Sequence, residues 1–396
     1  MNCDVRRTGA RRAVIGGLVG SGPTARRGWR WRAGRAVLLM AVLGLGLPVG
    51  LGTAGASTNR GSVFIRSNND FLTCGCVTSG DGSAANPYVI GPYQIGVPSN
   101  GTSGYAVKVG DSTAQVTKAF RITGISIGYT DTNPSDPVIW LDHVSGTQAN
   151  PISVSVIDAN NDGQGVEVDA SSWIALSNLN INKMNGAGVM ITSSSYITMA
   201  NSKLKATSDD QPFHTADGVY ALNSSSLSIG GVPACPKSQI CNSFDYDSGW
   251  GVYLQNTPNV TIDEASANAD DTAGYVFDAS SNVTLTNSTA EGDGPICLSG
   301  QRPTGYFPND LQGGLLLVNG SSDDLIMNDQ FSADPGGREI GSGGAGHYNN
   351  PCTGTQQPYG PPANPPVEGK MGTGNTYPGT CFKTTDIPGL TPSPCK

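Results

Sequence analysis

The segments GVEVDASSWIALSNLNINKMNG (165–186) and GVMITSSSYITMANSKLKATSDD (188–210) carry one repeated pattern, and this pattern decides the fold. Each copy starts with Gly and a short strand of alternating apolar and polar residues. A Ser-rich or Asn-rich turn leads into a second alternating strand, and an Asn, Asp or Gly corner closes the copy. The pattern returns at 251–273 and 274–294. Alternation of this kind is typical of half-buried β-strands, so the chain is predicted to be built from short strands.

The spacing of the copies favours a solenoid. Gly165 and Gly188 start successive copies 23 residues apart, and the same spacing separates Gly251 from Gly274. A period near this length with two or three strands per copy is typical of a parallel β-solenoid, in which stacked coils share one core. Leucine-rich repeats need regularly spaced leucines, and propeller repeats are about 40 residues long, so both are excluded. We expect an all-β parallel β-helix of about eight or more coils.

One set of alternating positions within each copy is apolar and is expected to point inward. Trp173 is expected to fill the interior as well. Other aromatic residues, Trp140, Trp250 and Tyr253 among them, would offer stacking surfaces for sugar rings if they point outward. The inward set comprises Val166, Val168, Ile174, Leu176, Leu179 and Ile181.

These coils resemble those of right-handed parallel β-helix repeat proteins, the group that includes NosD-like periplasmic proteins and carbohydrate-binding and sugar-hydrolase domains. GDGSAANPYVI (80–90) is similar to the segment that opens the first coil in many such proteins. The resemblance covers residues 75–335 and implies a right-handed parallel β-helix. It implies no single activity, because this fold carries lyases, hydrolases, epimerases, adhesins and assembly factors.

Composition divides the chain into four parts. Residues 1–56 contain nine of the 23 Lys and Arg residues, then an apolar stretch and an A-x-A site before Ser57, which predicts a cleaved signal peptide and a secreted, cell-surface or periplasmic protein. Residues 57–103 suit an N-terminal cap with the first coil, and 104–335 hold the repeats. The Gly/Pro-rich segment 336–396 is expected to be stapled by disulfides and to cover the other end of the solenoid.

Net charge limits the classes of molecule that the protein can bind, and the cysteine content predicts disulfides. Beyond residue 56, 14 basic and 30 acidic residues leave a net charge of −16, which excludes a nucleic-acid binder and docking on an anionic membrane. The eight cysteines of this part predict disulfides, Cys74-Gly-Cys76 included. We expect a monomer whose partner is a polysaccharide or cell-surface glycan, neutral or bridged by calcium, because the acidic surface would repel bare polyuronates.

Acidic residues collect at one corner of the coils. Asp217, Asp247 and Asp270 precede coil starts, so stacking would place them in a ladder. Three interpretations stay open. In the first, Asp occurs here only because it tolerates tight left-handed corners. In the second, Asp270 and Asp271 bind calcium through hard oxygen ligands. In the third, paired carboxylates perform acid–base chemistry on a glycan.

His214 lies among acids at this corner, and a neighbouring carboxylate would orient its ring and raise its proton affinity. DQPFHTAD (210–217) is similar to the Asp-Pro-His-Asp motif of β-helical mannuronan epimerases and alginate lyases. The spacing is stretched and the Tyr before the motif is missing, so Tyr220 or Tyr246 would have to replace it. The candidates are His214, Asp217, Asp210 and Asp247 for catalysis and Tyr220, Tyr246 and Trp250 for substrate binding.

The leading hypothesis is a secreted β-helix protein that binds polysaccharide along one face and, if it is an enzyme, acts on it as a lyase, epimerase or hydrolase. A non-catalytic structural or adhesive surface protein is the second hypothesis. A NosD-like accessory factor for copper-enzyme assembly is third, because copper handling calls for Met, His or Cys clusters and the chain has three His. Two of these, His143 at a strand end and His347 in the Gly-rich tail, are expected to be structural.

Overall fold

The chain divides into two compact units, Met1–Gly52 and Thr53–Lys396. The computed structural model describes the second unit over most of its length, and the fold below is that of this unit. In the described part of the chain no helix is long and apolar enough to cross a membrane. The described residues are 58–96, 104–128, 136–160, 163–205, 217–230, 242–245, 247, 249–268, 270, 273–291, 313–332, 338–341, 373–382, 390–391 and 393.

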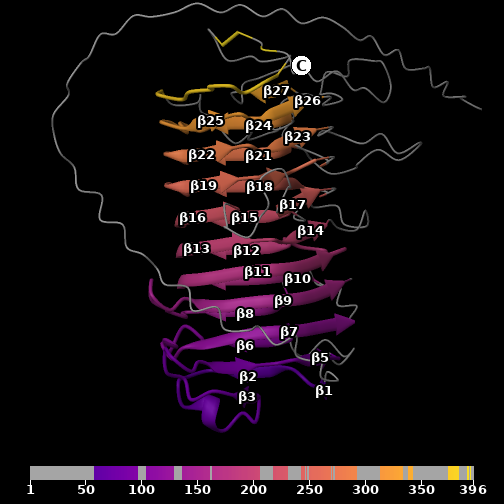
Figure 1. The fold of residues 1–396 in the computed structure, drawn as a ribbon, viewed down its shortest axis with the longest axis vertical. Coiled ribbons are helices and arrows are strands. Elements are labelled where there is room, and N and C mark those ends of the chain that lie inside the picture. Colours follow the sequence, from indigo (N-terminus) through magenta and orange to yellow (C-terminus); the bar gives the residue numbers. More distant parts are fainter. Residues whose placement is uncertain are drawn as a thin grey trace, which may run out of the picture. The chain divides into compact units, whose positions relative to one another are not determined.

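One ten-stranded sheet takes a single strand from each coil, in chain order. All neighbouring strands in it are parallel, as in β10 with β8 and β12. Figure 1 shows these strands lying one above another. The strands are β2 (Val63–Ile65), β6 (Val107–Val109), β8 (Pro137–Asp142), β10 (Gln164–Asp169), β12 (Val189–Thr192), β15 (Val219–Leu222), β18 (Trp250–Gln255), β21 (Ala273–Asp278), β24 (Gly313–Val318) and β27 (Arg338–Gly341).

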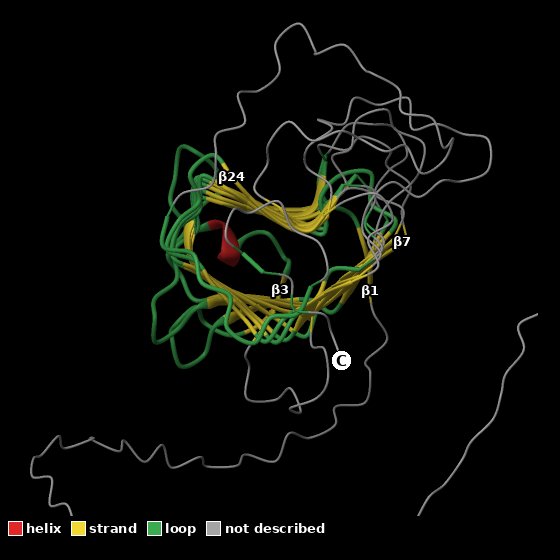
Figure 2. Ribbon diagram, turned by 90° about the horizontal axis from the view of Figure 1, so that it is seen from above, coloured by secondary structure: helices red, strands yellow, loops and turns green. Residues whose placement is uncertain are grey.

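A seventeen-stranded sheet forms the opposite wall, and Figure 2 shows the two walls facing each other across the coil interior. Its pairings are parallel except for β3 with β4. A 3-10 turn, η1 (Asp70–Leu72), lies near its first strands. The strands are β1 (Thr58–Arg60), β3 (Val77–Ser79), β4 (Tyr88–Ile90), β5 (Tyr93–Ile95), β7 (Phe120–Gly128), β9 (Ile152–Asn160), β11 (Ser172–Asn182), β13 (Ser195–Ala200), β14 (Lys203–Lys205), β16 (Ser225–Gly230), β17 (Asn242–Asp245), β19 (Val260–Asp263), β20 (Ala265–Ser266), β22 (Val283–Thr286), β23 (Thr289–Glu291), β25 (Leu325–Met327) and β26 (Gln330–Ser332).

The parallel β-helix expected from the repeat is therefore confirmed, and so is its inward set of side chains. Val166 pairs with Val189, Val189 with Val219 and Val219 with Val252, so the first valine of each coil lies in line with the next. Burying one such side chain contributes about 1.5–3 kcal/mol, so the stacked rows supply the main driving force for folding. The predicted inward residues Val166, Val168, Ile174, Leu176, Leu179 and Ile181 are all buried.

The corner after the ten-stranded sheet has the same construction in successive coils. One residue with positive φ turns the chain, and a buried Ser or Thr then follows inside the coil at six of the seven corners. Gly320 stands between Asn319 and its Ser321, and the corner at His143 is followed by the buried Val144 instead. Ser194 Oγ accepts the backbone N–H of Ser171 on the preceding coil at 3.0 Å and donates to Thr192 O at 2.8 Å. The polar backbone groups of the corner are thus satisfied without water. The turning residues are His143, Ala170, Ser193, Asn223, Asn256, Ala279 and Asn319, and the hydroxyl residues are Ser171, Ser194, Ser224, Thr257, Ser280 and Ser321.

The prediction for Trp173 is wrong. Its φ is +57°, and its ring lies parallel to that of Tyr196 on the next coil, with centroids 4.1 Å apart. Tyr196 is exposed, so the pair stacks outside the coil. The reason is the alternation itself, because Ile174 is the inward residue at this turn and its predecessor must face out.

Both ends of the described solenoid have contacts in addition to those of the regular coils. At the N-terminal end Phe71 stacks on Tyr88, with centroids 4.8 Å apart, and Cys74 is bonded to Cys76. At the other end Thr376 bridges Leu325 in parallel fashion. A part of the C-terminal segment therefore continues the seventeen-stranded sheet beyond β25.

Candidate functional site

The carboxylates of the acidic corner lie inside the coil, and the strand register places Asp217 level with Trp250 rather than with Asp247. Asp217, Asp247 and Asp270 are all buried. Asp217 Oδ1 accepts the Trp250 backbone N–H at 3.0 Å, and Asp270 Oδ1 accepts that of Asp247 at 2.8 Å. A Cβ added at Gly218 would lie 2.6 Å from Asp247 Oδ2, so the glycine leaves the space that the carboxylate occupies.

This geometry favours the structural interpretation of the corner. Burial raises the pKa of Asp217 to about 7, which reflects the cost of removing its charge from water. In the described ranges no group of three or more His, Cys, Asp or Glu side chains is arranged to hold a metal ion. His214, Asp210, Tyr246 and Asp271 lie outside the described residues, so the catalytic and calcium assignments that include them stay predictions.

The outer face of the ten-stranded sheet carries charged and aromatic side chains. Each coil strand has two inward residues separated by one position, such as Val166 and Val168 in β10, so the residue between them points to the other face. The strand register aligns these residues from coil to coil. We call this set the outer row; it comprises Phe64, Lys108, Trp140, Glu167, Met190, Tyr220, Tyr253, Val276 and Leu316.

The N-terminal half of this face is ionic. Lys108 Nζ lies 3.1 Å from Asp142 Oδ2 and 3.1 Å from the centroid of the Trp140 ring. The other carboxylate oxygen of Asp142 lies 2.6 Å from His143 Nδ1. We call Lys108, Asp142, His143, Glu167 and Asp169 the charged cluster.

Two carboxyl groups of the charged cluster have pKa values above the ordinary values for their residue types. Burial, and then the nearby charges of Asp169 and Asp142, raise the pKa of Glu167 to about 7, although Lys108 opposes the shift. The pKa of Asp169 is also raised, by burial and then by Asp142. At neutral pH Glu167 is therefore divided between its acid and carboxylate forms.

The C-terminal half of the face is aromatic. Tyr220 and Tyr253 stack with centroids 5.3 Å apart, and Trp250 lies against Tyr253 at 4.5 Å. Tyr220 Oη donates to Gln255 Oε1 at 3.0 Å, and Tyr253 Oη donates to Asp278 Oδ2 at 2.7 Å. The three rings are half-buried. We call Tyr220, Trp250, Tyr253, Gln255 and Asp278 the aromatic cluster.

The structure thus brings together Tyr220 and Trp250 of the predicted substrate-binding residues, with Tyr253 between them. Asp217 adjoins this group, since its carboxyl accepts the Trp250 backbone N–H at 3.0 Å, but that carboxyl is buried inside the coil. His143, expected to be structural, belongs to the charged cluster, and sequence analysis missed Lys108 and Glu167 altogether. Aligning the coils on the second strand residue, rather than on the corner, would have revealed the outer row.

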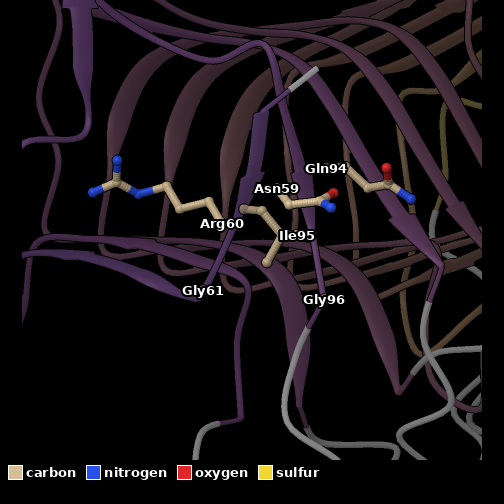
Figure 3. Close-up of a pocket in the computed structure, with 6 residues that line it drawn as sticks. All are labelled: Asn59, Arg60, Gly61, Gln94, Ile95 and Gly96. Atoms are coloured by element: carbon tan, nitrogen blue, oxygen red, sulfur yellow. The ribbon is translucent and has the colours of Figure 1, made fainter. Parts of the chain in front are cut away.

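A pocket at the N-terminal end is less suited to a ligand. Its lining comes from the ends of β1 and β5, and Figure 3 shows Arg60 extending away from Gln94. The Arg60 guanidinium donates to Gly75 O at 2.7 Å and to Cys74 O at 2.9 Å. These bonds tie the Arg60 side chain to the backbone at the N-terminal end of the solenoid. The lining residues are Asn59, Arg60, Gly61, Gln94, Ile95 and Gly96.

Comparison with known proteins adds a family and several distant likenesses. A family model described as a right handed beta helix region matches residues 139–345, more than half of the chain. No curated protein matches the sequence. Solved structures that resemble this one include the A-module of an Azotobacter vinelandii mannuronan C-5 epimerase, with 11% identity, a TM-score of 0.39 and coverage of 76% of this chain and 79% of that chain.

Two further likenesses are of the same order. A pectate lyase has 13% identity and a TM-score of 0.38, with 85% of this chain and 82% of that chain covered. Tailspike protein 2 of Escherichia coli bacteriophage CAB120 has 10% identity and a TM-score of 0.37, with 71% of this chain covered. The chain spans 38% of the length of that tailspike. None of these likenesses bears on activity.

Proposed function

The chain belongs to the right-handed β-helix family, and we propose that it is an exported protein that binds a polysaccharide along the outer face of its ten-stranded sheet. The aromatic cluster carries the proposal. Tyr220 and Tyr253 lie on adjacent coils with their rings stacked and half-buried, and the polar groups of Gln255 and Asp278 lie beside them. Apolar rings edged by a few fixed polar groups are typical of ligand sites.

The chemistry of the aromatic cluster suits a sugar. The C–H face of a pyranose packs on an aromatic ring, while its hydroxyls need both donors and acceptors. Gln255 Nε2 donates to Asp278 Oδ2 at 3.1 Å, so amide and carboxylate orient each other in advance of a ligand. Neighbouring rungs are about 4.8 Å apart, so the half-buried part of the outer row, from Trp140 to Tyr253, offers contacts at regular steps to a linear polymer. Val276 and Leu316, at the end of the row, are fully buried.

Charge and compartment favour particular glycans. A net charge of −16 beyond residue 56 favours neutral chains, or acidic chains whose charge is bridged by calcium. Export is supported by the bond between Cys74 and Cys76, because disulfides persist in oxidising compartments.

Affinity electrophoresis against a panel of neutral plant, algal and bacterial polysaccharides tests the proposal. The wild type is expected to be retarded by at least one of them, and Tyr253→Ala to weaken that binding by about tenfold or more, since a stacked ring contributes roughly 1 kcal/mol beyond its buried area. Tyr196→Ala is the matched control, because Tyr196 is exposed outside the outer row.

Retardation equal in Tyr253→Ala and wild type would remove the aromatic cluster from the function. No retardation by any glycan, with or without calcium, would favour the structural or adhesive alternative.

A further inference from the structure

Lys108 and Asp142 bring an amine and a carboxyl into contact across two coils. The side chain of Lys108, in β6, runs over Trp140 of β8 and ends with Nζ 3.1 Å from Asp142 Oδ2. The two side chains are 10% and 9% exposed. Phe64 on the preceding coil lies 6.0 Å from Nζ, so aromatic rings rather than water surround much of the amine.

The Asp142 carboxyl is held at both oxygens. Oδ2 faces Lys108, and Oδ1 lies 2.6 Å from His143 Nδ1. Gly110 on the preceding coil packs against the Asp142 backbone, since an added Cβ there would lie 1.8 Å from the Asp142 carbonyl oxygen.

We propose that Lys108 and Asp142 condense to an amide that joins Nζ to Cγ and links the coils of β6 and β8. A proton first passes from the ammonium to the carboxylate, and the neutral Nζ attacks Cγ. The Nζ–Cγ bond forms and the Cγ–Oδ2 bond breaks. Oδ2 leaves as water with the two hydrogens lost from Nζ, and nothing is oxidised or reduced. This modification goes beyond glycan binding and does not depend on it.

The surroundings favour each part of the reaction. An ion pair with little access to water bears a desolvation penalty, which a neutral amide removes. His143, with its proton on Nδ1, would donate to Oδ1 as negative charge develops there. Fixing the two groups in contact supplies an effective concentration far above that of free reactants.

Glu167 can move the protons. It faces the pair from the next coil, where its position in the outer row follows that of Trp140. Because its pKa lies at about 7, its carboxyl can accept a proton from Nζ and return it to the leaving oxygen at neutral pH. The other charged groups at the pair are Asp169 and His143, whereas Arg66 is engaged with Asp111 at 3.1 Å.

Mass spectrometry of the purified full chain, unfolded and with its disulfides reduced, tests the proposal. The wild type is expected to be lighter than its sequence mass by one water. Lys108→Arg keeps the positive charge without a nucleophilic amine, and this variant and Asp142→Ala should both have their full sequence masses. Glu167→Gln should lose most of the linked form while its circular dichroism still shows β-structure.

Tryptic digestion locates the bond. The linked form should give one branched peptide that contains both Lys108 and Asp142, with no cleavage after Lys108. Full sequence mass in the folded wild type would overturn the proposal. A missing water found in a linear peptide, as cyclisation at Asp81-Gly82 would produce, would overturn it equally.

Discussion

Burial decides what a carboxyl does in this solenoid. Asp217, Asp324 and Asp329 lie inside the coil, and burial raises their pKa values to about 7, 7 and 8. Each accepts a backbone N–H from a neighbouring coil, from Trp250, Val283 and Ser288 respectively. A raised pKa therefore marks part of the framework here, and it identifies a catalytic acid only where the carboxyl also faces outward.

The pH dependence of stability follows from these three groups. Their pKa values lie above the unfolded value of 3.8, so the folded chain binds more protons and its stability falls as pH rises from about 4 to about 8. Asp217→Asn keeps an oxygen for the Trp250 N–H but removes one titration. The melting temperature of this variant, followed by circular dichroism across that window, should fall less steeply than that of the wild type. Equal slopes would contradict the assignment.

Strands and corners differ in how far sequence determines them. The period of two fixes the inward valines from sequence alone, and the same period places Trp173 outside, contrary to the expectation that it fills the interior. A corner has no such period. The repeat places Asp247 and Asp270 at the same point of successive coils, but their inward direction depends on backbone angles and on the space beside Gly218 and Gly251.

The charged cluster was beyond prediction for a related reason. Lys108 and Asp142 meet because a long side chain leans along its strand by two residues and across one coil. Pairing register gives neighbours directly opposite one another, whereas this contact is diagonal. Rotamers and packing decide such contacts, and neither can be read from the repeat.

A pair of substitutions tests the register of the strands. Val189→Asp should abolish folding, because Val189 is fully buried between Val166 and Val219 and the new charge would have no partner. Met190→Asp, one residue later in the half-buried outer row, should fold with a melting temperature within a few degrees of the wild type. Far-UV circular dichroism and thermal unfolding distinguish the two. A folded Val189→Asp protein would show that the register is wrong.

For the whole molecule, stability comes from the stack rather than from any coil. Each coil contacts its two neighbours, so the free energy of unfolding is a sum of coil and interface contributions. The end coils have one neighbour each and need other cover. Thr376 and Cys381 provide some of it by bridging Leu325 and Gln330.

Export of the protein predicts a particular N-terminus and a particular state of the cysteines. We expect the secreted protein to begin near Ser57 and to contain no free thiol, since the leader would be removed and Cys74 is already bonded to Cys76. Intact mass before and after alkylation, without and with reduction, measures both. An intact Met1 or several alkylatable cysteines without reduction would contradict the assigned compartment.

The strand register of the ten-stranded sheet stays the same when the loops between the strands differ in length. Val166 pairs with Val189 after 23 residues, and Val189 pairs with Val219 after 30. Duplication of one repeat in the gene would therefore insert a complete coil and leave the others in place. Each such event would lengthen the outer row by one step of about 4.8 Å. Under the proposed function, the length of polysaccharide bound along this face would therefore change by whole coils.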